Sequence, residues 1–229
     1  MNSYKNFWES DKAQDFHEMK NYKTMEIPKI AGLIEKANPA TFLDYGCGNG
    51  LINTMLSKKI EKTLFDINLN NISIKNPDEY NCKISKRAAD LPSDYFDMVL
   101  LSFVLVCVPD EKQIMEILRN IRRVKKRNGA LIILESHPCF VQYSFSYFDS
   151  ALDKDFKYLS DGAPFQRNIF DSAGDKISFI DYHWPLSFKI NKLIETGFNI
   201  VHMEETPDED FCGRPRNKFF PPLYYFICR

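Results

Sequence analysis

Glycine is scarce in this chain. Its 229 residues include only 9 glycines, whereas an average usage of about 7% would give about 16. Three of the nine, Gly46, Gly48 and Gly50, fall within five residues. Because glycine lets the backbone come close to another group, this cluster predicts a place where main-chain amides approach a ligand.

Long apolar runs are also missing. The longest run, residues 98–108, is interrupted by Ser102 and falls far short of the roughly 20 residues that a membrane-spanning helix needs. The first twelve residues contain both acids and bases and no apolar signal region. We therefore expect a cytoplasmic protein without a membrane partner.

Neither cysteine spacing nor charge points to a metal or a polyanion. The six cysteines include no Cys-x-x-Cys pair, so we expect small buried thiols rather than a disulfide framework or a metal site. Lys and Arg (30) nearly cancel Asp and Glu (31), which disfavours a nucleic-acid partner. The one basic cluster ends a predicted helix, where cations complement the helix dipole, and consists of Arg119, Arg122, Arg123, Lys125, Lys126 and Arg127.

Apolar strands and helical spacing alternate along the chain. Strands are predicted at residues 40–45, 62–67, 82–84, 96–102, 130–135, 198–204 and 223–228, and helices at 26–37, 51–60, 111–126 and 186–196. Asn128 and Gly129 are predicted to form a turn between a helix and a strand. This alternation predicts an α/β fold with a doubly wound, mostly parallel sheet and a ligand site at the carboxyl ends of its strands.

Aromatic residues crowd into residues 140–188. Thirteen of these 49 positions are Phe, Tyr or Trp, against 14% in the whole chain. Such rings either form a satellite core or line the site of an organic ligand with few polar groups.

The glycine cluster follows directly on the first predicted strand. In the dinucleotide motif Gly-x-Gly-x-x-Gly the third glycine packs a helix on a strand, but Leu51 takes that position here, and Asp44 stands two residues before the first glycine. These residues resemble the class I S-adenosylmethionine-dependent methyltransferases, whose first motif reads acid-x-Gly-x-Gly-x-Gly. Asp66, 22 residues after Asp44, ends the second strand, where that family places an acid.

The resemblance continues in order over about residues 40–229. FDMVLLS, NGALIILE and LIETGFNIVHMEE resemble the family's fourth, fifth and sixth strands with their adjoining turns. It implies one Rossmann-like domain over residues 1–229, with a seven-stranded sheet of order 3-2-1-4-5-7-6. It also implies an N-terminal cap segment (1–25) and a helix-and-loop lid insertion between strands 5 and 6 (about 138–184).

The same resemblance implies that S-adenosylmethionine is the cofactor and indicates its binding residues. Asp66, with Ile67 beside it, would bind the ribose hydroxyls, and Asp90 with Leu91 would border the adenine. The loop would hold the methionine part through Asp44, Gly46, Cys47 and Gly48. Ser102 either contacts that part or is a buried hydroxyl bonded to the backbone.

The acceptor is expected to be a small organic molecule methylated on oxygen or nitrogen. His137 and His183 are the candidate bases, because histidine titrates near neutral pH, although each is alternatively a structural residue. The chain reads SFVL after the fourth strand, without the Asn/Asp-Pro-Pro-Tyr signature of macromolecular amine methylation. The alternatives are a tRNA or protein methyltransferase and a catalytically silent S-adenosylmethionine-binding regulator. The sequence indicates no oligomeric state.

Overall fold

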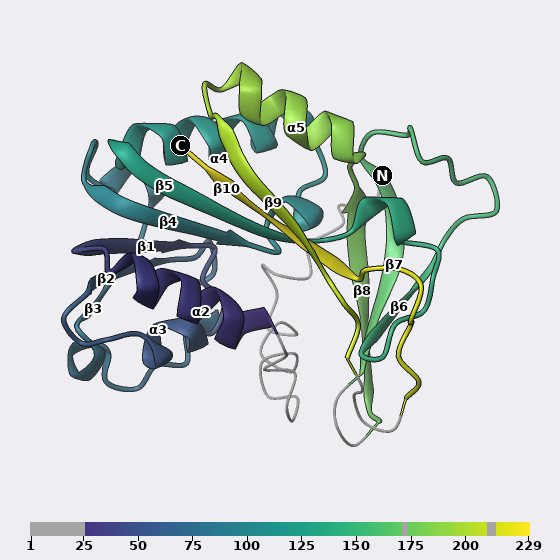
Figure 1. Ribbon diagram of the computed structural model, residues 1–229, viewed down its shortest axis with the longest axis horizontal. Coiled ribbons are helices and arrows are strands. Elements are labelled where there is room, and N and C mark those ends of the chain that lie inside the picture. The colour runs from purple at the N-terminus through teal and green to yellow at the C-terminus, as the bar shows by residue number, and fades with distance from the viewer. Residues whose placement is uncertain (1–25, 171–173, 210–213) are drawn as a thin grey trace.

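A seven-stranded sheet forms the centre of the molecule (Figure 1). The structure is a computed structural model that describes residues 26–170, 174–209 and 214–229. The expected cap segment, residues 1–25, lies outside the described residues. The sheet strands are β1 (Thr41–Tyr45), β2 (Glu61–Phe65), β3 (Cys82–Ser85), β4 (Phe96–Ser102), β5 (Lys125–Ser136), β9 (Ile200–Thr206) and β10 (Leu223–Cys228).

The strand order is β3-β2-β1-β4-β5-β10-β9. The first five strands are parallel to one another, and β10 runs antiparallel to both β5 and β9. Numbered among themselves, these seven strands follow the expected order 3-2-1-4-5-7-6. The labels 10 and 9 arise because three further strands, absent from the prediction, lie between β5 and β9 in the chain.

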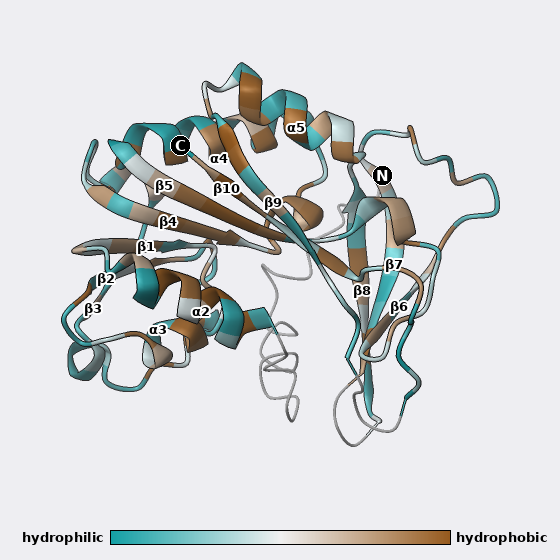
Figure 2. Cartoon of the chain, in the orientation of Figure 1, coloured by the Kyte–Doolittle hydropathy of each residue, from teal (hydrophilic) through white to brown (hydrophobic). Residues whose placement is uncertain are grey.

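Helices cover both faces of the sheet (Figure 1). They are α2 (Glu26–Ala37), α3 (Leu51–Met55), α4 (Glu111–Val124) and α5 (Leu186–Glu195). On one face α4 and α5 pack on apolar side chains such as Val99 and Ile133. On the other face Ile30 and Ile34 of α2 pack on Leu100. Because both faces are covered, the buried stretches of the central strands are apolar, such as residues 98–101 of β4 and 131–134 of β5 (Figure 2).

The helices have the expected positions with two changes in length. The predicted helix 51–60 stops at Met55, and α4 stops at Val124, where β5 begins at once. None of the helices in the described ranges combines the length and the apolar character needed to cross a membrane.

The predicted turn at Asn128 and Gly129 lies within β5. The parallel register moves from Phe96 opposite Lys125 to Met98 opposite Ala130, so four residues bulge out between the paired positions. The buried Lys125 ammonium donates to the carbonyl oxygen of Gly129 at 2.9 Å and closes this bulge. The chain therefore makes a bulge where the sequence favoured a helix-ending turn.

The aromatic insertion is a second sheet rather than the expected helix-and-loop segment. Its strands are β6 (Phe148–Ala151), β7 (Ala163–Phe170) and β8 (Lys176–His183), all antiparallel. This sheet stands beside the carboxyl end of β5 (Figure 1). Alternate residues of β8 are buried, and in β7 Phe165 and Arg167 are buried together with Asn168. This is close to the pattern of a sheet with one covered face.

Candidate functional site

The turn after β1 brings the backbone close to neighbouring strands. Gly46 has a φ of 76°, a conformation that favours glycine. A Cβ at this position would lie 2.4 Å from Cγ2 of Val104. The amides of Gly46 and Cys47 donate to the carbonyl oxygen of Phe65 at 2.7 and 3.0 Å. These bonds fix the turn against the end of β2, with no room for a side chain at Gly46.

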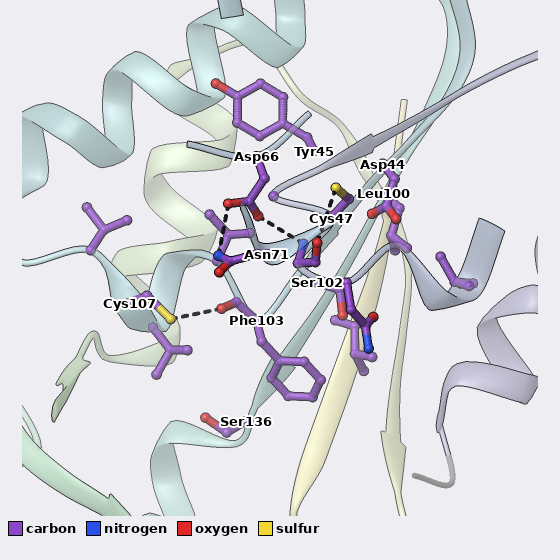
Figure 3. Close-up of a pocket in the computed structure, with 18 of the residues that line it drawn as sticks. Asp44, Tyr45, Cys47, Asp66, Asn71, Leu100, Ser102, Phe103, Cys107 and Ser136 are labelled. Atoms are coloured by element: carbon purple, nitrogen blue, oxygen red, sulfur yellow. Dashed lines mark hydrogen bonds between the residues drawn. The ribbon is translucent and has the colours of Figure 1, made fainter. Parts of the chain in front are cut away.

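Asp66 joins this turn to the segment that follows β2. Its carboxylate accepts hydrogen bonds from the amides of Gly48 and Asn68, both at 2.9 Å, and from Nδ2 of Asn71 at 3.3 Å (Figure 3). Burial raises the pKa of Asp66, and the three donors oppose that effect. A carboxylate held in this way is a fixed two-oxygen acceptor at the end of a strand.

Asp44 lies deeper, at the foot of the turn. It is 3% exposed, and its carboxylate accepts a hydrogen bond from Nδ2 of Asn53 at 2.6 Å. Burial raises its pKa to about 7; the Asn53 bond lowers it, and the nearby charge of Asp66 raises it further. Burial, together with both carboxylates, also raises the pKa of the Cys47 thiol. That thiol stays protonated and is not a nucleophile.

A cavity of about 640 Å³ opens over these residues, a size typical of small-molecule sites. It extends from the glycine turn, past the end of β4, to the buried face of the inserted sheet. Seven of the nine residues assigned to the cofactor from sequence line it: Asp44, Gly46, Cys47, Gly48, Asp66, Ile67 and Ser102. Figure 3 shows Asp44, Asp66 and Ser102 from different strands gathered around this space.

Asp90 and Leu91 are not among the lining residues. The Asp90 carboxylate accepts two hydrogen bonds from the Arg87 guanidinium, at 2.7 and 3.0 Å, and Leu91 is buried in the core. The side chain of Asp90 points to Arg87 from the 3₁₀ turn of Ala88–Asp90, and its contact with an adenine stays a prediction. Ala88, in the same turn, does line the cavity.

The two histidines predicted as bases also lie outside the lining. His137 donates from Nε2 to Glu205 at 2.7 Å, and its Nδ1 accepts from the amide of Cys139 at 3.3 Å. Both ring nitrogens are thus occupied, so this ring has no free position for an acceptor's proton. His183 is 2% exposed and donates from Nε2 to the carbonyl oxygen of Tyr158 at 2.7 Å. Both rings are held by partners within the protein, and their role as bases stays a prediction.

The inserted sheet contributes two aromatic residues of the kind expected at a ligand site and two charged residues that sequence reasoning missed, Arg167 and Asp181. Phe148, Arg167, Phe179 and Asp181 line the far end of the cavity. Arg167 and Asp181 stand at inward positions among aromatic neighbours, in PFQRNIF and SFIDYH. The available signal was a charged residue two positions after a phenylalanine, Phe165 before Arg167 and Phe179 before Asp181. This signal indicates a buried charge only when these segments are already known to be strands.

The cofactor end of the cavity suits the group that the sequence implied. The turn at Gly46 leaves a space that a side chain would fill, and Asp66 presents two oxygens to it. The Asp44 carboxylate lies at the foot of this turn, beside the side-chain oxygen Oδ1 of Asn53. That oxygen makes no hydrogen bond within the described residues. Together these groups can bind a ligand that carries hydroxyls and a positive charge.

Comparison with known proteins finds similarity to methyltransferases. Residues 43–133 match a family model described as a methyltransferase domain. The chain is 24% identical to N-demethylindolmycin N-methyltransferase of Streptomyces griseus over 231 residues, covering 93% of this chain and 95% of that protein.

Solved structures share the fold. The CcbJ methyltransferase of Streptomyces caelestis superposes with a TM-score of 0.69 at 14% identity, covering 98% of this chain and 97% of that one. The 1,6-didemethyltoxoflavin-N1-methyltransferase of Burkholderia thailandensis, solved with 1,6-didemethyltoxoflavin and S-adenosylhomocysteine, superposes with a TM-score of 0.56 at 15% identity, covering 94% and 82%. The domain match, the relative and the sheet with its glycine turn are thus all similar to what is found in class I S-adenosylmethionine-dependent methyltransferases.

Proposed function

We propose that this enzyme transfers a methyl group from S-adenosylmethionine to a nitrogen or oxygen of a small organic acceptor. The observation that carries the proposal is the single continuous cavity, with the glycine turn and Asp66 at one end and the inserted sheet at the other. A reaction between two bound molecules needs both in one enclosed space, aligned for in-line attack. Nitrogen is favoured, because the curated relative and one structural neighbour are named as N-methyltransferases.

The chain's own residues would bind and orient the two reactants. S-adenosylmethionine supplies a methyl group already activated by its sulfonium. Asp66 would accept hydrogen bonds from the ribose hydroxyls, and Asp44 with the turn 46–48 would hold the methionine part. The rings of Phe148 and Phe179, at the far end, would exclude water from the acceptor.

A nucleic-acid or protein acceptor is less well supported by the position of the basic residues. The cluster lies at the end of α4 and the start of β5, where Lys125 pairs with Phe96 at the amino end of β4. The cavity lies at the opposite, carboxyl edge of the sheet. Arg123 and Lys126 are also engaged within the protein, with the Leu91 carbonyl and with Asp97.

The test is incubation of the protein with methyl-labelled S-adenosylmethionine and a metabolite extract, followed by mass detection of the labelled product. The expected result is one small labelled compound. Label found only in added tRNA or protein would favour a macromolecular acceptor. Binding of the cofactor in a thermal-shift assay, with no label transferred to any class of acceptor, would favour a silent regulator.

The matched pair of variants for this test is Asp66→Asn and Asp149→Asn. Asp149 lies on the inserted sheet and is not among the cavity-lining residues. Asp66→Asn is expected to weaken binding of S-adenosylhomocysteine by at least about tenfold, because hydrogen bonds to a charged group contribute about 1.5–3 kcal/mol. Asp149→Asn should bind as the wild type does. Unchanged affinity in Asp66→Asn would contradict the ribose role.

A further inference from the structure

Arg167 and Asp181 form a buried ion pair at the far end of the cavity. Each residue is 3% exposed, and Nε of Arg167 donates to Oδ2 of Asp181 at 3.1 Å. Arg167 comes from β7 and Asp181 from the adjacent strand β8. Both residues line the cavity, so the pair borders the space that we assign to the acceptor.

The guanidinium of Arg167 is held rigidly. Nη1 donates to Oγ of Ser150 at 2.8 Å and Nη2 to Oγ of Ser136 at 3.2 Å. The rings of Phe148 and Phe165 lie 4.5 and 4.9 Å from its central carbon. An arginine side chain has five N–H donors. Three are used here, so one N–H on each Nη is left for a ligand.

Asp181 likewise keeps an unused acceptor. Its Oδ2 takes the Arg167 bond, whereas the neighbour of Oδ1 is the Cys107 sulfur at 4.0 Å, a weak donor at long range. Burial raises the pKa of Asp181 to about 6, and the charge of Arg167 opposes this effect. The other charges that act on it are Glu135, which raises the pKa, and Lys189, which lowers it. The carboxylate is therefore ionised at neutral pH but remains a useful proton acceptor.

The charges at this end sum to zero, which limits what it can bind. A carboxylate ligand would approach Arg167 only beside the carboxylate of Asp181, and an ammonium ligand would meet the guanidinium in the same way. Like charges side by side in a buried site are strongly unfavourable. A neutral group that offers one donor next to one acceptor satisfies both members of the pair.

We propose that Asp181 and Arg167 recognise an acceptor that presents an N–H next to a hydrogen-bond-accepting oxygen or nitrogen. The edge of a lactam, an amidine or a nitrogen heterocycle has this pattern. The N–H donates to Oδ1 of Asp181, and its neighbour accepts from an Nη of Arg167. This inference rests on the proposed methyl transfer and names the chemistry of its acceptor.

The pair also provides a route for the proton. The acceptor nitrogen forms the new N–C bond while the methyl–sulfur bond breaks with its electron pair on sulfur. The proton of that nitrogen passes to Oδ1 of Asp181 and later to solvent. Asp181 is thus assigned as a catalytic residue, and Arg167 as the group that fixes the acceptor's edge.

Binding to the wild-type protein saturated with S-adenosylhomocysteine gives the first test. Quinazolin-4-one and isoquinolin-1(2H)-one carry the proposed N–H edge, N3-methylquinazolin-4-one lacks the donor, and 2-naphthoate carries a negative charge. We expect a compound with the N–H edge to bind at least about tenfold more tightly than the other two, the effect of one hydrogen bond to a charged group. Equal binding of 2-naphthoate, or no binding of either N–H compound, overturns the proposal.

Asp181→Asn gives the second test, with Asp149→Asn as the control on the same sheet. Asp181→Asn keeps the shape and an oxygen for Arg167 but removes the charge and the base. It should bind S-adenosylhomocysteine with an affinity within twofold of wild type. It should lower kcat/KM for the acceptor that wild type methylates by about 10²–10⁴-fold, the contribution of a general base. The wild-type profile of kcat/KM should fall below about pH 6, and Asp181→Asn should lack this limb.

The outcomes separate this inference from the proposed function. Methyl transfer by Asp181→Asn at the wild-type rate, with the acid limb retained, overturns the role of Asp181 and leaves the methyltransferase assignment intact. The absence of any methylated product with wild type overturns the proposed function itself. The wild-type pH profile needs no variant, so the proposal is testable even if Asp181→Asn fails to fold.

Discussion

Replacing Asp44 with Asn should stabilise the cofactor-free protein at neutral and alkaline pH. Asp44 is buried beneath the glycine turn, and burial raises its pKa from 3.8 to about 7. Above that pH the folded protein holds a buried carboxylate with one hydrogen bond, from Asn53. This is an unfavourable arrangement unless a positive charge is bound beside it.

The size and sign of the effect follow from the two pKa values. A carboxyl group that holds its proton more tightly when folded makes the folded state less stable as the pH rises between these values. The pKa is about three higher in the folded state, and each unit corresponds to about 1.36 kcal/mol. The loss is therefore at most about 4 kcal/mol, spread between about pH 4 and pH 7 and complete above pH 7.

The local structure accepts the amide. Asn53 donates from Nδ2 to Asp44, and its own Oδ1 is buried without a hydrogen bond within the described residues. An amide at position 44 can accept the existing bond and donate a second one to that oxygen. One kcal/mol shifts the melting temperature of a domain of this size by about 2–4 °C. Asp44→Asn should therefore melt several degrees higher than wild type at pH 8.

The assay is calorimetric unfolding of both proteins from pH 4 to pH 9 without cofactor. The difference in melting temperature should grow with pH and level off above about pH 7. Asp97→Asn is the control of opposite sign: burial raises the pKa of Asp97, but hydrogen bonds from Lys126 and Thr41 outweigh it and lower that pKa. That variant should be less stable than wild type at neutral pH. A wild type that is more stable than Asp44→Asn at pH 8, or a difference independent of pH, refutes the reasoning. The same variant should bind S-adenosylhomocysteine at least about tenfold more weakly, because the amino group of the ligand loses a charged partner.

Three further predictions concern other parts of the structure. Gly46→Ala should weaken cofactor binding and lower the free energy of unfolding, measured in urea, by about 1–3 kcal/mol. Adding Val104→Ala should restore only the stability lost through the 2.4 Å contact, and not the stability lost through the positive φ. Lys189→Met leaves the fully buried Glu135 carboxylate without its 3.0 Å partner and should cost about 3–5 kcal/mol; adding Glu135→Gln should recover much of this loss, and additive losses would contradict the pairing. His183→Asn should lower the melting temperature and leave kcat/KM within a few-fold of wild type, since its ring bonds the Tyr158 carbonyl outside the cavity lining. A large loss of kcat/KM with unchanged stability would restore His183 as a base.

The cofactor end was predictable because its parts are close in sequence. β1, the glycine turn and β2 lie within residues 41–65, and β1 and β2 are parallel neighbours. The carboxyl ends of adjacent parallel strands meet at one edge, so Gly46 and Asp66 had to come together once both strands were recognised. The Gly48 amide accordingly donates a hydrogen bond to the Asp66 carboxylate at 2.9 Å.

Side-chain direction was harder to predict than backbone position. Asp90 follows the third strand, as expected, but Arg87, three residues earlier, donates hydrogen bonds to both of its carboxylate oxygens. His137 follows β5 directly, as expected, but its ring bonds Glu205, 68 residues away. These directions depend on partners that a strand-and-helix pattern does not specify. The backbone was therefore inferred correctly at positions where the sequence did not indicate the partners of the side chain.

The charged pair at the far end of the cavity was not predicted, for a different reason. This pair depends on β7 lying antiparallel to β8, with Phe165 opposite Asp181 and Arg167 opposite Phe179. The aromatic segment was recognised from its composition, but its strands were not, because irregular spacing of large rings fits a loop as well as a sheet. Only the strand register places two charged residues of this segment on one buried face.

The cofactor end and the inserted sheet are held by different backbone bonds, and this affects how acceptor specificity can change. The residues around the cofactor are tied to the main sheet by backbone bonds such as that from Gly46 to Phe65. The inserted sheet makes its own backbone ladder, and its inward side chains reach the main sheet through side-chain bonds such as that from Arg167 to Ser136. Inward residues of β7 and β8 can therefore be replaced without breaking the bonds that shape the cofactor end. Changes there should alter which acceptor is methylated while leaving cofactor affinity almost constant, so the two properties can be measured and engineered separately.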